Sequence, residues 1–79
     1  MLEDLSSGKK VVGIKQLRKA VAANMVKTVF LAMDADPFLT DPVRRLCEEM
    51  NVAIVDVPTM AELGRACGIS VSASAAGLM

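Results

Sequence analysis

Two aspartates, Asp34 and Asp36, directly follow the apolar run of residues 30–33, and carboxylates in this position could do chemistry. Aspartyl-phosphate phosphatases place such a pair after an apolar strand, with one Asp as nucleophile and the other as acid or base. Those enzymes next require Thr or Val where this chain has Phe38, together with a lysine, further magnesium-binding acids and a much longer chain. We therefore favour a loop in which both side chains accept hydrogen bonds from backbone N–H groups ahead of a helix.

A glycine followed by a basic stretch occupies residues 13–19. After Gly13, the predicted helix opens with unpaired N–H groups and the positive end of its dipole, and both favour phosphate. Lys15 and Lys19 add positive charge, and Gln16 offers a donor and an acceptor for a base edge. The pattern is neither a dinucleotide fingerprint nor a P-loop. It indicates an anion site, with an ordinary solvated helix face as the alternative.

A third segment, residues 59–71, first indicates a structural role. Gly64 and Gly68 favour a helix packed closely on a sheet. The residues after Gly68 nevertheless leave Ile69 and Val71, which are apolar, in a turn at the edge of the sheet. A binding partner could cover that turn.

The residue types that the chain lacks narrow its function. It contains no His, Tyr or Trp, and its two aromatic residues are Phe30 and Phe38. A histidine-based triad, metal site or general base is therefore impossible, and single-strand binding by rows of stacked rings is disfavoured. Cys47 and Cys67 lie in apolar helical patterns without zinc or redox spacing, so we predict two buried free thiols. We expect neither a metal nor a cofactor.

Length and hydropathy bound the architecture. The chain has 79 residues, 53% of them apolar, and a mean hydropathy of +0.45. This length suits one domain over residues 1–79, and the apolar fraction is too high for disorder. No apolar stretch approaches the roughly 20 residues that cross a bilayer, and the acidic start at residues 1–4 lacks signal-peptide features. We expect a cytoplasmic protein with no membrane partner.

The charges sum to zero but are distributed unevenly. Residues 1–33 carry six basic against two acidic side chains, whereas residues 34–62 carry seven acidic against two basic ones. A polyanion could bind the basic part because short-range attraction follows the local patch. The alternative is that these are ordinary solvated faces.

Strands alternate with helices in the predicted chain. Apolar spacing gives strands at residues 9–12, 26–33, 52–57 and 69–76, and helices over 14–24, from about residue 40, and from about residue 60. Thr59 and Glu62 form a capping box for the last helix, and Gly68 can end it in the left-handed conformation. This alternation predicts an α/β sandwich around a central sheet.

Three motifs together resemble a known family. They are G-I-K-Q-L-R-K-A at residues 13–20, D-A-D-P at 34–37 and L-G-R-A-C-G-I-S-V at 63–71. In this order and spacing they resemble the ribosomal-protein L-seven-Ae-like family, most closely its short bacterial members, over residues 9–76. The resemblance implies a three-layer α-β-α sandwich with a four-stranded mixed sheet. It also implies a monomeric, non-enzymatic protein that binds kink-turn RNA, ribosomal or regulatory: a sharply bent duplex with tandem sheared G·A pairs and a bulge.

The resemblance also implies which residues contact the RNA. The helix start and Lys19 would lie in the major groove at the G·A pairs, the acid of the D-A-D-P turn near an extruded nucleotide, and the last turn against the bulge. The residues at these positions are Gly13, Ile14, Lys15, Gln16, Lys19, Asp36, Ile69, Ser70 and Val71.

The chain departs from the family pattern at two places. Many archaeal and eukaryotic members have Asn-Glu where this chain has Lys15 and Gln16, and eukaryotic members often have Lys in place of Met60. A neutral Gln16 must use its carbonyl oxygen where a carboxylate would accept from guanine, so its contact should be weaker. Relatives of the same fold also act as protein-interaction adaptors through acidic loops, and the acidic residues 34–62 suit that alternative. An adaptor would not need Lys15, Gln16 and Lys19 together, so RNA binding is favoured.

Overall fold

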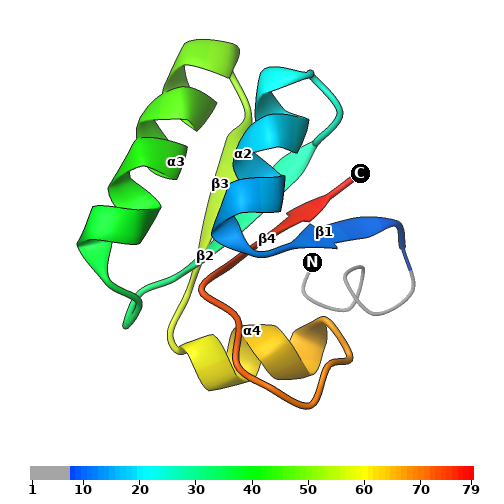
Figure 1. Ribbon diagram of the computed structural model, residues 1–79, viewed down its shortest axis with the longest axis vertical. Helices are drawn as coiled ribbons and strands as arrows, with labels where there is room; N and C mark the ends of the chain where they lie inside the picture. Colours follow the sequence, from blue (N-terminus) through cyan, green and yellow to red (C-terminus); the bar gives the residue numbers. More distant parts are fainter. Residues whose placement is uncertain (1–7) are drawn as a thin grey trace.

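The computed structural model describes residues 8–79, so the acidic start at residues 1–4 lies outside the described residues. Within residues 8–79, four strands alternate with three helices (Figure 1). They are β1 (Lys10–Val12), α2 (Ile14–Ala22), β2 (Thr28–Ala32), α3 (Pro37–Met50), β3 (Ala53–Val57), α4 (Met60–Ala66) and β4 (Ala75–Leu78). In this part of the chain, none of the helices has the length and apolar character needed to span a membrane.

The strands form one mixed sheet in the order β1-β4-β2-β3. β4 pairs antiparallel with both β1 and β2, and β2 pairs parallel with β3 through the crossover helix α3. The four-stranded mixed sheet is the arrangement predicted from the sequence.

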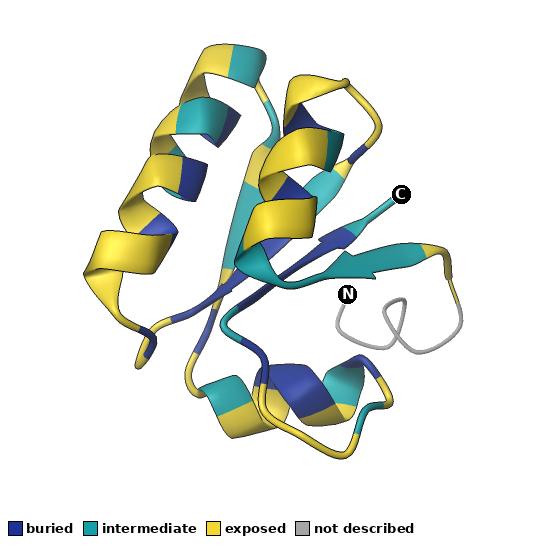
Figure 2. Cartoon of the chain, viewed as in Figure 1, coloured by how far each residue is buried: buried dark blue, intermediate teal, exposed yellow. Residues whose placement is uncertain are grey.

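The sheet separates two hydrophobic clusters. Helices α2 and α3 cover one face, and α4 covers the other (Figures 1 and 2). Neighbouring residues of β2 point to opposite faces, so Phe30 is buried beneath α4 while Leu31 is buried beneath α2 and α3. The predicted three-layer α-β-α sandwich is therefore confirmed.

Helix α3 begins earlier than the sequence predicted, at Pro37 instead of near Thr40. The Asp36 carboxylate accepts a hydrogen bond from the Phe38 N–H at 2.9 Å, and Pro37 occupies the first turn, where a missing N–H is tolerated. Pro42, which a start near residue 40 would place in the first turn, therefore lies inside the helix. Because proline has no N–H, the usual helical donor to the Phe38 carbonyl is absent.

The last strand is also shorter than predicted: β4 spans Ala75–Leu78, and residues 69–74 form a loop. Most of this loop is held by α4, because the Ile69 N–H donates to the Gly64 carbonyl at 3.2 Å and the Ala73 N–H donates to the Met60 carbonyl at 3.0 Å. The alternating small and apolar residues imitate a strand, and the pattern alone could not reveal these contacts.

The Thr59 half of the predicted capping box is present at the start of α4, and the end of this helix and the two thiols follow the prediction. The Thr59 hydroxyl accepts from the Glu62 N–H at 3.1 Å, and Gly68 has a φ of +77°. Cys47 and Cys67 are both buried and free. Burial raises the pKa of each thiol above its ordinary value, because the thiolate loses hydration.

Helix α4 and the loop approach each other most closely at Gly64. A Cβ built on this buried glycine would lie 2.1 Å from the Val71 carbonyl oxygen and 2.9 Å from the Ser72 Cα. Both neighbours are backbone atoms, so a larger residue requires the loop to move.

We predict that Gly64→Ala lowers the free energy of unfolding by about 1–3 kcal/mol, the usual effect of overpacking. Chemical denaturation of the purified protein measures this change, and Ala61→Ser, at an exposed position of the same helix, is the control. A stability of Gly64→Ala within about 0.5 kcal/mol of the control would contradict the close packing.

Candidate functional site

The predicted site residues come from three separate segments that meet at one end of the sheet. Because β1 and β2 both run antiparallel to β4, the strands β1, β2 and β3 all finish where β4 begins. We call this place the loop end of the sheet; it is marked by Val12, Ala32, Val57 and Ala75 (Figure 1). The start of α2, the Asp34–Asp36 turn, the start of α4 and the loop of residues 69–74 all lie here.

Backbone hydrogen bonds hold these segments together. The Gly13 N–H donates to the Ala75 carbonyl at 3.0 Å, which joins the start of α2 to the start of β4. The Ala32 N–H donates to the Ser74 carbonyl at 3.0 Å, which joins the end of β2 to the loop. The loop end of the sheet is therefore one continuous surface.

The start of α2 is open to a ligand. Gly13 has a φ of +104°, which L side chains rarely adopt, and a Cβ built there would meet nothing within 4 Å. The N–H groups of the next three residues, 14–16, have no backbone acceptor within residues 8–79. A backbone free of side chains and three outward N–H groups at the positive end of a helix suit an anion or an electronegative base edge.

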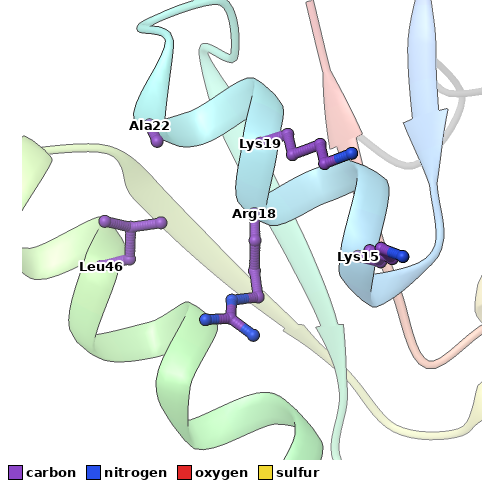
Figure 3. A pocket seen from close by; sticks show the side chains of 5 residues that line it. All are labelled: Lys15, Arg18, Lys19, Ala22 and Leu46. Atoms are coloured by element: carbon purple, nitrogen blue, oxygen red, sulfur yellow. The ribbon is translucent and has the colours of Figure 1, made fainter.

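The polar side chains of α2 divide between two directions. Lys15, Gln16 and Lys19 are exposed, as predicted for a binding face. In Figure 3, Lys19 extends away from α3, whereas Arg18 extends toward it. The side chain of Ile14, predicted to contact RNA, is half-buried against the core, so this residue offers the site its backbone N–H.

Both aspartates of the turn accept backbone hydrogen bonds. Asp36 caps α3 through the bond to the Phe38 N–H, and Asp34 Oδ1 accepts from the Met60 N–H of α4 at 2.7 Å. The prediction that these carboxylates satisfy N–H groups ahead of a helix is confirmed. The turn thereby ties β2 to both helices that follow it, and a pair of carboxylates bound in this way does not resemble a phosphatase nucleophile with its acid.

The loop of residues 69–74 presents one large apolar side chain to solvent. Val71 is 67% exposed, whereas Ile69 is half-buried against the cluster beneath α4, and Ser70 is exposed. The sequence predicted all three as a contact surface. The structure assigns the outward apolar part to Val71 and gives Ile69 a role in anchoring the loop.

Two exposed apolar side chains at the loop end of the sheet were not predicted as functional. Met33, directly after β2, is 69% exposed, and Phe38, in the first turn of α3, is 84% exposed. Phe38 precedes the helix start predicted near residue 40, and an aromatic residue outside the predicted elements was the one available sequence signal.

The fold and the site together define a class of protein. It is a small α-β-α sandwich whose loop end presents an open helix start and a basic helix face. Residues 2–78 match the Ribosomal protein L7Ae/L30e/S12e/Gadd45 family. The chain belongs to this family, as its three motifs indicated.

Relatives and solved structures agree with this assignment. The chain is 45% identical over 69 residues to an "RNA-binding protein" of Bacillus pumilus, covering 87% of this chain and 84% of that one. It is 46% identical over 68 residues to an RNA-binding protein of Caldanaerobacter subterraneus subsp. tengcongensis, covering 86% and 83%. The structure of the Giardia lamblia 15.5kD RNA binding protein superposes with a TM-score of 0.91 at 28% identity, covering 98% of this chain and 68% of that one.

We predict that Asp34→Ala lowers the free energy of unfolding by about 1 kcal/mol, because the Met60 N–H loses its acceptor. Asp34→Asn keeps an acceptor oxygen and should lose less. Glu49→Ala, on the exposed face of α3, is the matched acidic control. Denaturant titrations measure all three, and equal stability of Asp34→Ala and the control would show that the cap contributes nothing.

Proposed function

We propose that this protein binds RNA without catalysing a reaction, and that its target is a kink-turn. The observation that carries the proposal is the start of α2. There the bare backbone of Gly13 and three N–H groups without a backbone acceptor in residues 8–79 lie beside the exposed Lys15, Gln16 and Lys19. The names of the bacterial relatives and of the Giardia protein support RNA as the ligand, and the family motifs support the kink-turn.

The two kinds of polar side chain on α2 suit different parts of the RNA. Lys15 and Lys19 are flexible cations that can follow phosphates, and such contacts set position without reading sequence. Gln16 lies one turn before Lys19 and can reach a base edge while the lysines hold the backbone. Specificity for the sheared G·A pairs therefore depends on Gln16 and on the open N–H groups around Gly13.

The other two segments suit the bulge. Val71 offers an apolar surface for an unstacked base or sugar, and the turn that contains Asp36 lies at the same end of the sheet. Backbone hydrogen bonds fix the start of α2 and the end of β2 against the start of β4 and its loop, so a kinked duplex that matches this arrangement makes contacts that an extended duplex does not. Binding then favours the kinked form of an RNA that populates both.

The structure gives one reason to prefer RNA over the adaptor alternative. Three of the exposed acids in residues 34–62 make intramolecular contacts: Asp34 and Asp36 cap helices, and Asp56 pairs with Arg44 at 2.6 Å. These contacts stabilise the fold, so the three carboxylates are less available to a partner protein. The basic face of α2 contains no such pair within residues 8–79.

The decisive measurement is a titration of the protein against a kink-turn duplex and against the same duplex with its G·A pairs made Watson–Crick. We expect the kink-turn to bind about tenfold more tightly or better, since each lost base contact costs about 1–3 kcal/mol. Fluorescence from labels on the two arms reports bending in the same experiment. Equal affinity for both RNAs would refute kink-turn recognition.

Gln16→Ala should weaken binding to the kink-turn by about 1–3 kcal/mol and leave binding to the ordinary duplex nearly unchanged, because the base contact is lost and the charges remain. The matched control is Lys19→Ala, one turn later on the same helix. This control should weaken binding to both RNAs and reduce the slope of log K against log salt by roughly one. If Gln16→Ala weakens both RNAs equally, Gln16 does not read the G·A pairs.

A further inference from the structure

A groove between α2 and the first half of α3 is not used by the proposed kink-turn contacts. Its volume is about 330 Å³, and its lining includes Ile14, Arg18, Phe38, Leu39, Asp41 and Arg45. Ile14 follows Gly13 directly, so the groove begins beside the open start of α2. The groove therefore continues the surface already assigned to RNA.

Phe38 is the most exposed of the large apolar side chains in residues 8–79. The core face of α3 is formed by Thr40, Val43 and Cys47, so the helix directs Phe38 away from the sheet. Leu39, which also lines the groove, is 43% exposed. One aromatic face and one aliphatic neighbour in water form a platform on which a flat apolar ring can be buried.

Two guanidinium groups line the same groove. Arg18 extends from α2 toward α3 (Figure 3), and Arg45 comes from the middle of α3, two turns after Phe38. Neither forms an ion pair within residues 8–79, in contrast to the adjacent Arg44, which is bound to Asp56 of β3. The groove also contains the acid Asp41, so its lining carries two positive charges and one negative charge.

We propose that this groove binds an unpaired nucleotide of the RNA, with the base stacked on Phe38 and the adjoining phosphates beside Arg18 and Arg45. The base must be unpaired, because within a duplex both faces of each base are covered by its neighbours. An aromatic platform flanked by cations is how proteins bind single strands without reading their sequence. This proposal rests on the proposed function and extends it from the kink to the strand that leaves it.

The test compares a blunt kink-turn RNA with the same RNA carrying four unpaired adenines, added in turn to each of its four strand ends. We expect one extension to tighten binding about tenfold, which corresponds to stacking of one base. Phe38→Ala and Arg45→Ala should each abolish most of this gain and leave affinity for the blunt kink-turn unchanged. Met25→Ala, at an exposed methionine beyond the far end of α2, should retain the gain.

A second readout detects the stacked base directly. The chain has no Trp or Tyr, so Phe38→Trp introduces a single fluorophore at an exposed position. The extended RNA should quench its emission, and the blunt RNA should not. Phe38→Leu should keep the apolar contact but lose the affinity gain, because a branched aliphatic side chain cannot stack.

The outcomes separate this proposal from the preceding one. If every extended kink-turn binds no better than the blunt one, or if Phe38→Ala keeps the gain, the groove does not bind the strand. An acidic, apolar segment of a protein then becomes its better occupant. The same extensions are also added to an ordinary duplex. If they tighten binding there in a way that depends on Phe38, the groove binds an unpaired strand even if the protein shows no preference for the kink-turn.

Discussion

The position of β4 between β1 and β2 is the constraint on which the rest of the structure depends. Because β4 is antiparallel to both neighbours, three strands end and one begins at the same end of the sheet. Residues Ala75, Ala76 and Gly77 of β4 are buried, and their small size lets helices cover both faces of the sheet. If β4 paired with only one of β1 and β2, either the Gly13–Ala75 bond to the start of α2 or the Ala32–Ser74 bond to the end of β2 would be lost. The site therefore follows from strand order more than from any one side chain.

Much of this fold could be predicted from the sequence, because local patterns determine its elements. The spacing of Leu17 and Val21 identified α2, and the β-branched, apolar run that contains Phe30 identified β2. The predicted first residue of α3 was wrong because Asp-Pro pairs at residues 36–37 and 41–42 both suit a helix start, and the sequence does not show which pair begins the helix. The bounds of β4 were wrong because its preceding loop is held by α4, a contact between distant segments.

The candidate site likewise has a part that the sequence predicts and a part that depends on the tertiary structure. The residues at the start of α2 could be predicted as a binding site from the sequence. The chemistry of a glycine, an amide and two lysines does not depend on which residues lie next to them in the fold. The half-burial of Ile14 and Ile69 was not predictable, because burial depends on which face of the sheet lies beneath them. In the sequence, Phe38 stood out only as a departure from an enzyme motif. Its exposure indicates a binding role only in the fold, where Arg18 of α2 extends toward α3.

The contacts of the loop of residues 69–74 determine which molecule must rearrange when a complex forms. Backbone hydrogen bonds to Gly64, Met60 and Ala32 fix both ends of this loop before any partner arrives. The entropy of ordering it is thus lost during folding and does not subtract from the binding free energy. The loop then needs little rearrangement on binding, and most of the conformational change must occur in the RNA. For the kink-turn target proposed above, the rate of capture would depend on how often the RNA bends spontaneously, and ions that promote bending would speed association without touching the protein.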